Sequence, residues 1–144
     1  QATDSFPIVC AARATTTNSR KTCFALAGNS STVYYMADTL YQDSGVNYTT
    51  TVVTEPLDFG NSNRKLMSKM CILADRPTAT TNINVSWTDD DYQTYSAVRT
   101  INLNQTSVAT CRLGQFTQRA FKLTYTDNYP LRLQRLEASI NKGA

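Results

Sequence analysis

Apolar residues recur at every second position through most of this 144-residue chain. The run NINVSW (82–87) alternates polar and apolar side chains, and FKLTY (121–125) repeats the pattern. Successive side chains of a β-strand point to opposite faces of a sheet, so this spacing predicts half-buried strands. The 22 threonines and eight tyrosines strengthen the prediction, because both residue types favour the surface of a sheet.

Turn-forming residues separate these runs at intervals of roughly 10 to 20 residues. They occur at Ala27–Ser30, Asp43–Gly45, Asp58–Asn61, Asp75–Pro77 and Asp127–Pro130. The spacing predicts nine or ten strands, and a chain made only of strands buries its apolar faces by packing two sheets together. We therefore expect an all-β fold, an antiparallel two-sheet sandwich.

The segment KLMSKMCILA (65–74) is expected to form one of these strands. Strict alternation places Leu66, Met70 and Ile72 on one face, and Lys65 and Met67 on the other. The first face is the apolar one, so it is expected to pack in the core.

The closing segment LRLQRLEASI carries two apolar pairs of different parity. Leu131 and Leu133 share one face, whereas Leu136 and Ile140 share the opposite one. One extra residue near Gln134-Arg135 would restore a common face, which is what a β-bulge does. We predict a bulged strand here, with a helix as the alternative.

The first residues of the chain differ in character from the rest. Residues 1–21 are polar and are expected to form an irregular arm or one strand, whereas residues 22–144 are expected to form a single β-sandwich domain. The chain begins with Gln1 rather than Met, so we expect a cleaved or excerpted piece of a longer protein. No stretch approaches 18 apolar residues, so neither a membrane span nor a signal peptide is predicted.

Four cysteines and the absence of histidine limit the expected metal chemistry. The spacing of Cys10, Cys23, Cys71 and Cys111 matches no zinc pattern. Most of them lie in short apolar runs, where a free thiol packs as a small apolar side chain. We expect buried free thiols, with two disulfides as the alternative.

The run Asp89-Asp90-Asp91 lies between two alternating runs, where a hairpin turn is expected. Aspartate suits turns because its carboxylate accepts hydrogen bonds from nearby backbone N–H groups. A calcium loop needs converging ligands and usually a glycine, and consecutive residues of an extended chain point in opposite directions. We interpret the run as a turn, and a weak calcium site formed by the three aspartates is the alternative.

The sequence shows no catalytic constellation. There is no histidine for a nucleophilic triad and no glycine-rich phosphate loop. Glu55 and Glu137 are the only glutamates, and nothing in the sequence links either to the Asp run as a glycosidase pair. We therefore predict a protein that is not an enzyme and that has no cofactor.

The net charge of +3 is unevenly distributed. Residues 112–144 contain six basic and two acidic residues, whereas residues 1–111 contain eight basic and nine acidic ones. A basic end faces either solvent or an anionic partner. The arginines that we assign to a subunit interface or to a channel near DNA are Arg112, Arg119, Arg132 and Arg135.

Two long segments resemble a known family. VSWTDDDYQTYSAVRTINLN and CRLGQFTQRAFKLTYTDNYPLRLQRLEASINKG are similar to the closing segment of tail-nozzle and packaged-DNA-stabilisation proteins of short-tailed bacteriophages. The matching elements are the Asp-rich turn with Thr94-Tyr95, then Arg99, Leu113-Gly114, Arg119 with Phe121, and Pro130-Leu131. The upstream segment from Tyr41 to Pro77 also fits, so the resemblance covers about residues 41–143.

The Asp-rich turn also resembles an Asp-box, a Ser/Thr-x-Asp-x-Gly-x-Thr-aromatic hairpin that caps sheets in several β folds. Thr88, Asp90, Thr94 and Tyr95 match this pattern, but Tyr92 stands where glycine is usual. The Asp-box is structural in most of its hosts. We assign turn or structural roles to Asp90, Thr94, Tyr95, Gly114 and Pro130.

The resemblance implies a virion protein that multimerises in the head-to-tail channel and retains packaged DNA. The implied partners are copies of itself in a ring and other tail or portal proteins, with non-specific DNA contact. The alternative is a secreted carbohydrate- or ligand-binding β-sandwich module that uses exposed aromatic side chains. Trp87 shares its parity with Ile83 and Val85, so we expect it in the core rather than on a sugar-binding surface.

Overall fold

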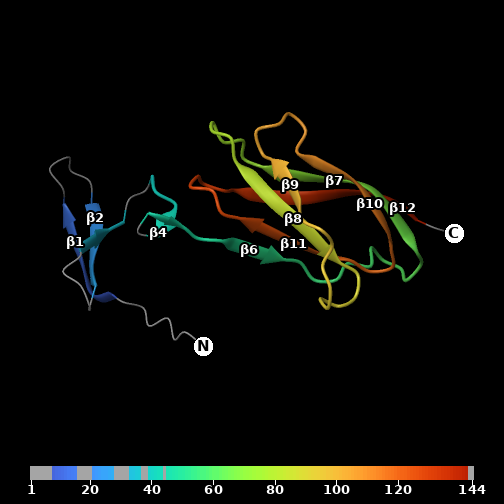
Figure 1. Ribbon diagram of the computed structural model, residues 1–144, viewed down its shortest axis with the longest axis horizontal. Coiled ribbons are helices and arrows are strands. Elements are labelled where there is room, and N and C mark those ends of the chain that lie inside the picture. Colours follow the sequence, from blue (N-terminus) through green and yellow to red (C-terminus); the bar gives the residue numbers. More distant parts are fainter. Residues whose placement is uncertain (1–7, 16–20, 28–32, 37–38, 44, 143–144) are drawn as a thin grey trace. The chain divides into compact units, whose positions relative to one another are not determined.

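The structure is a computed structural model that describes residues 8–15, 21–27, 33–36, 39–43 and 45–142. These residues form twelve strands, all of them antiparallel where their pairing is given, and no helix, so none of them belongs to a helix that could cross a membrane. The predicted all-β antiparallel class is confirmed. The strands divide between two compact units, residues 1–46 and 47–144, which are described separately below (Figure 1).

The first unit contains a three-stranded sheet in the order β1-β2-β3. Its strands are β1 (Ile8–Thr15), β2 (Lys21–Ala27) and β3 (Val33–Tyr35). Two short strands follow and pair with each other: β4 (Gln42–Asp43), and β5 (Val46–Asn47), which spans the boundary between the two units. None of the side chains described in residues 1–46 is buried.

The second unit is a β-sandwich with one sheet of four strands and one of three. The four-stranded sheet has the order β6-β11-β8-β9 and consists of Thr50–Val53, Ala120–Tyr125, Asn82–Thr88 and Arg99–Asn102. The three-stranded sheet has the order β10-β7-β12 and consists of Ala109–Phe116, Lys65–Ala74 and Leu133–Lys142. Strands β9 and β10 are therefore edge strands of different sheets.

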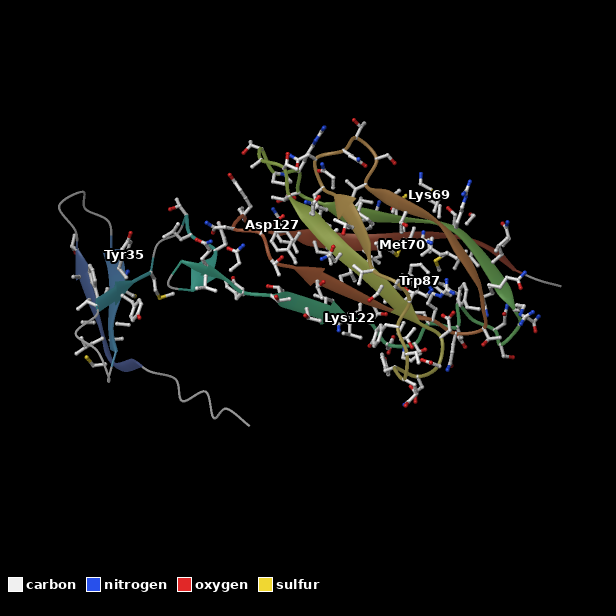
Figure 2. The ribbon with its side chains drawn as sticks, in the orientation of Figure 1. Tyr35, Lys69, Met70, Trp87, Lys122 and Asp127 are labelled. Carbon is white, nitrogen blue, oxygen red and sulfur yellow. The ribbon has the colours of Figure 1, made fainter. Side chains whose placement is uncertain are left out.

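Side chains from both sheets of the sandwich form one apolar core. Met67 and Met70 of β7 lie on one side, and Val85 of β8 and Leu123 of β11 lie on the other. Met70 is labelled within the sandwich in Figure 2. Trp87 packs against this core while remaining partly exposed, so the alternation that grouped it with Ile83 and Val85 predicted its side correctly.

The face assignment predicted for β7 is wrong at its N-terminal end. Leu66 is 41% exposed, whereas Lys65 and Met67 are buried. The pairing with β12 skips Ser68, because Ser139 lies opposite Lys69 and Ile140 lies opposite Met67. This extra residue is a β-bulge, which reverses the faces of the residues before it.

The buried Lys65 ammonium is satisfied by backbone carbonyl groups. Its Nζ donates hydrogen bonds to the carbonyls of Asn61 at 2.6 Å, Asn63 at 2.7 Å and Thr117 at 2.9 Å. Three acceptors match the three N–H donors of the ammonium, so the charge is buried without an unpaired proton.

The bulge predicted near Gln134-Arg135 is confirmed, because the register of β12 against β7 shifts between Leu133 and Arg135. The alternative of a helix in this segment is excluded, since the chain is extended from Leu133 to Lys142. Twelve strands exceed the nine or ten expected because β3, β4 and β5 are only two or three residues long, too short to show periodicity.

The boundary between the compact units and the state of the cysteines differ from the sequence-based expectations. The two units meet between Val46 and Asn47 rather than at residue 21. All four cysteines are free, but Cys10, Cys23 and Cys111 are exposed and Cys71 is only half-buried. The expected burial of the thiols is therefore wrong, because Cys10 and Cys23 lie where no described side chain is buried, and Cys71 and Cys111 lie outside the buried core of the sandwich.

Candidate functional site

The Asp-rich turn is a loop closed by hydrogen bonds between its own residues. The Thr88 hydroxyl donates to Asp90 Oδ1 at 2.6 Å, and the Thr94 backbone N–H donates to the same oxygen at 2.9 Å. The Thr94 hydroxyl donates to Asp90 Oδ2. At the base of the loop, the Ser96 N–H donates to the Trp87 carbonyl at 2.8 Å. The side chain of Asp90 thus organises the whole turn.

These donors act on the acidity of Asp90. The hydrogen bond from the Thr88 hydroxyl, followed by those from the hydroxyl and N–H of Thr94, lowers the Asp90 pKa from 3.8 to about 2. Hydrogen bonds to an ionised carboxylate favour its charged form, which accounts for the direction of the shift. Asp90 therefore serves as a permanently charged acceptor for the turn at neutral pH.

The backbone of the turn enters the left-handed region at two residues. Asp91 has φ of 54° and Tyr92 has φ of 67°. Tyr92 thus adopts the conformation that glycine usually provides in an Asp-box, and a side chain there is strained. The Tyr92 hydroxyl donates to the Thr54 carbonyl at 3.0 Å, which anchors the strained residue to the segment after β6.

Asp89 connects the turn to the sandwich through Arg119. The Arg119 Nε lies 2.6 Å from Asp89 Oδ1, and Nη2 lies 2.7 Å from Oδ2, a bidentate ion pair. Arg119 Nη1 also donates to the Leu113 carbonyl at 2.7 Å. The guanidinium carbon is 4.3 Å from the centroid of the Phe116 ring and 5.4 Å from that of Trp87.

Arg119 therefore does not belong to the predicted interface or channel set. Its side chain is 1% exposed, and its charge is neutralised inside the sandwich. The other three arginines of that set are exposed. Arg132 lies 3.7 Å from Asp75, and Arg135 lies 2.6 Å from Glu137.

The three aspartates of the run serve different purposes. Asp89 pairs with Arg119, Asp90 organises the turn, and Asp91 is exposed. Within the described residues, no three acidic or cysteine side chains are grouped so that they could hold a metal ion. The arrangement is therefore structural: Asp90 fixes the backbone of the turn, and the Asp89–Arg119 ion pair holds the turn to the sandwich.

The remaining predicted turn residues have mixed environments. Tyr95 is exposed, and the Lys122 ammonium lies 5.2 Å from the centroid of its ring. Gly114 has φ of +81° beside a register shift of β10, where Arg112 also has positive φ. Pro130 lies in the exposed link between β11 and β12.

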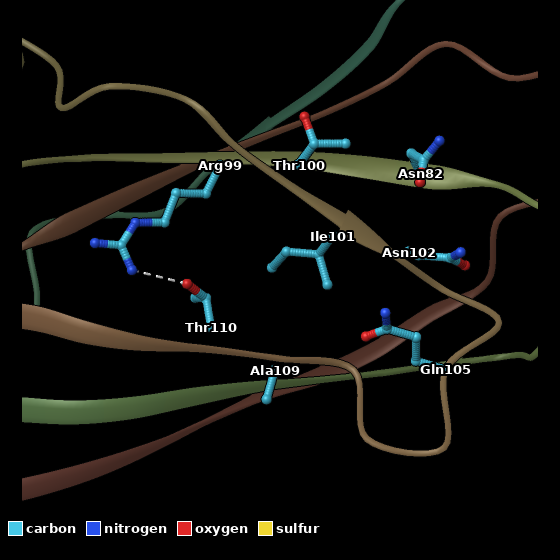
Figure 3. Close-up of a pocket in the computed structure, with 8 residues that line it drawn as sticks. All are labelled: Asn82, Arg99, Thr100, Ile101, Asn102, Gln105, Ala109 and Thr110. Atoms are coloured by element: carbon cyan, nitrogen blue, oxygen red, sulfur yellow. Dashed lines mark hydrogen bonds between the residues drawn. The ribbon is translucent and has the colours of Figure 1, made fainter.

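A pocket of about 500 Å³ lies beside the edge strands β9 and β10, and the sequence did not predict it. Figure 3 shows the Arg99 guanidinium at one end and the amide side chains of Asn82, Asn102 and Gln105 at the other, with Ile101 between them. Thr100, Ala109 and Thr110 complete the lining. The only sequence signal was the Asn- and Gln-rich stretch INLNQ, which resembles an ordinary turn.

Arg99 connects the two edge strands across the end of this pocket. Its Nη1 donates to Thr110 Oγ1 at 3.0 Å and to the Cys111 carbonyl, and its Nη2 donates to the Arg112 carbonyl at 3.0 Å. The guanidinium carbon lies 4.8 Å from the centroid of the Trp87 ring. Arg99 and Arg119 thus both contact the same indole.

Comparison of the sequence with protein-family models and with curated proteins gives no match to either.

Proposed function

We propose that this chain is a structural module of a bacteriophage tail or head-to-tail connector, which works by assembling with copies of itself and with neighbouring tail or portal proteins in the virion. The proposed family rests on the resemblance of residues 41–143 described above. The proposed mode of action, assembly, rests on the first compact unit.

The single observation that carries the assembly proposal is the exposure of the sheet β1-β2-β3. No side chain described in residues 1–46 is buried, although several are large and apolar. Tyr35 is 61% exposed and Met36 is 74% exposed. Tyr35 is labelled on this sheet in Figure 2.

A sheet is stable when at least one face is covered, and an uncovered sheet of three strands has little apolar burial to offset the entropy of ordering its chain. Strand β1 is an edge strand that pairs only with β2 among the residues that the structure describes, and the backbone groups of such an edge can accept another strand. Other copies of the chain in a ring would cover such a surface.

Sedimentation of the full chain over a range of concentrations tests the assembly proposal. We expect a mass that rises with concentration, and we expect Tyr35→Asp to lower it by placing a charge in the interface. Val98→Asp is the matched control, since Val98 is an exposed apolar residue of the second unit. A wild-type chain that stays a monomer at every concentration would refute the proposal.

The virion assignment has its own experiment. Images of purified phage particles, labelled with an antibody against this chain, are expected to show label at the tail or at the head-to-tail joint. Label on no part of the particle would exclude the assignment while leaving self-assembly intact.

We infer a second candidate function, a carbohydrate- or ligand-binding module, from the pocket beside β9 and β10. Its volume of about 500 Å³ falls in the range typical of small-molecule sites, and its lining is rich in amide and hydroxyl groups. The chemistry of that pocket is developed below.

A further inference from the structure

We propose that the pocket between β9 and β10 binds an acidic saccharide, with the acid group at Arg99 and the sugar hydroxyl groups at the amide end. This inference deepens the second candidate function and does not depend on the assembly proposal. It rests on the charge of Arg99, the polarity of the lining, and the position of the pocket in the sandwich.

The charge of Arg99 has no carboxylate partner in the described part of the chain, where the ion pairs involve Arg119, Arg132 and Arg135. Its hydrogen-bond acceptors are a hydroxyl and two backbone carbonyls, all of them neutral. Three of its hydrogen bonds are accounted for, whereas a guanidinium carries five N–H donors. A half-buried, uncompensated cation favours an anionic ligand, because a charge-assisted hydrogen bond is about twice as strong as a neutral one.

Arg119 provides an internal comparison for this argument. Both guanidinium groups lie near the Trp87 ring, at 4.8 Å for Arg99 and 5.4 Å for Arg119. Asp89 neutralises Arg119 through two short hydrogen bonds. No acidic residue lines the pocket in which Arg99 lies. The indole thus contacts two cations, of which only one is paired within the chain.

The opposite end of the pocket is suited to hydroxyl groups. Each of Asn82, Asn102 and Gln105 carries both a donor and an acceptor in its side chain, as does each hydroxyl group of a sugar. Between the two ends, the half-buried Ala109 provides apolar surface for the C–H groups of a sugar ring, whereas Ile101, which is 5% exposed, belongs mostly to the core. The lining thus changes from cationic to neutral and polar along the pocket, as an acidic sugar requires (Figure 3).

The position of the pocket makes it accessible. Strand β9 is an edge strand of the four-stranded sheet and β10 is an edge strand of the three-stranded sheet, and among the described residues no further strand pairs with either edge, so the pocket opens there. Arg99 donates hydrogen bonds to β10 at one end of the space between the two edge strands. The remainder of that space is the pocket.

Calorimetric titration of the full chain with sialic-acid and uronic-acid oligosaccharides tests the proposal. Each oligosaccharide is paired with a form whose carboxyl group has been converted to the amide. We expect at least one acidic form to bind, and its amide to bind about tenfold more weakly, which is the effect of losing one charged hydrogen bond. We also expect added salt to weaken the binding of the acidic form.

Three variants assign the binding to this pocket. Arg99→Gln removes the charge while keeping a donor, and we expect binding to weaken about tenfold or more. Gln105→Ala changes only an exposed side chain and is expected to weaken binding less, without unfolding the protein. Arg132→Gln removes one exposed positive charge elsewhere and is expected to leave binding unchanged.

Each of the following three outcomes would overturn the inference. If acid and amide bind equally, the site takes neutral sugars, and the second candidate function stands without the acid requirement. If both Arg99→Gln and Gln105→Ala bind as the wild type does, the ligand lies elsewhere on the protein. If no acidic or amidated oligosaccharide binds at millimolar concentration, both the inference and the second candidate function fail.

Discussion

Arg119 is the residue on which the Asp-rich turn depends most. Its guanidinium pairs with Asp89, is shielded from solvent, and lies against the ring of Phe116. Side chains in such positions are usually apolar, since a buried charge must be fully paired. This ion pair, between residues 30 apart in sequence, attaches the surface turn to the residue that directly precedes β11.

We predict that Arg119→Ala lowers the free energy of unfolding by about 3 kcal/mol, at the low end for a broken buried ion pair. The low end applies because Asp89 is 38% exposed and water can solvate it after the change. Urea unfolding gives the value. Arg132→Ala, which removes an arginine that is 79% exposed, is expected to cost less than about 0.5 kcal/mol. Equal losses in the two variants would contradict the role of Arg119.

Asp90 makes the stability of the turn depend on pH. Its pKa is lowered in the folded protein to about 2, against 3.8 for the unperturbed group. A lowered pKa stabilises the fold above the unperturbed value, and this stabilisation is lost as the pH falls from about 4 towards about 2.

We therefore expect the wild type to be more stable than Asp90→Asn at neutral pH, and the difference to shrink between about pH 4 and about pH 2. Urea unfolding at a series of pH values measures the difference. Asp91→Asn removes an adjacent exposed carboxylate and controls for the change in net charge. A difference that is constant through this interval would show that Asp90 is not the titrating group.

Among the elements, β7 shows most clearly what alternation cannot predict. A single extra residue at Ser68 reverses the face of the residues before it, so Met67 is buried and Leu66 is not. The buried Lys65 is tolerated because its ammonium donates hydrogen bonds to carbonyls of the turn after β6 and to the carbonyl of Thr117. Nothing in the local sequence places those carbonyls.

We predict that Met67→Ala costs about 2 to 5 kcal/mol of unfolding free energy, as expected for a side chain removed from a packed core. Leu66→Ala is expected to cost less than about 1 kcal/mol, since Leu66 is 41% exposed and lies outside the packed core. Denaturant unfolding of the two variants provides the comparison. If Leu66→Ala cost more unfolding free energy than Met67→Ala, Leu66 would face the core, as simple alternation assigned, and the bulge would be contradicted.

The features that the sequence predicted correctly depend on residues close together in the chain. The Asp90 turn is determined by residues only four apart in sequence, and the bulge in β12 by a parity change within one segment. The Arg119–Asp89 pair could not be predicted because its residues are 30 apart in sequence, and the pocket could not be predicted because it lies between strands of different sheets. Arg99, for example, reaches Thr110 only because two different sheets end at β9 and β10.

At the scale of the whole molecule, the two compact units differ in how they are stabilised. Residues 47–144 contain a core shared by two sheets and two buried cations with their partners. In residues 1–46, no described side chain is buried. A domain that buries its own apolar surface is stable alone, whereas an uncovered sheet depends on what it binds.

Hydrogen exchange of the full chain at several concentrations tests this account most directly. If other copies cover the first unit, protection of the amides of β1 and β2 rises with concentration, while that of β7 and β8 stays constant. Tyr35→Asp is expected to reduce the rise. Protection of β1 and β2 that is the same at all concentrations would contradict the claim that assembly stabilises this sheet.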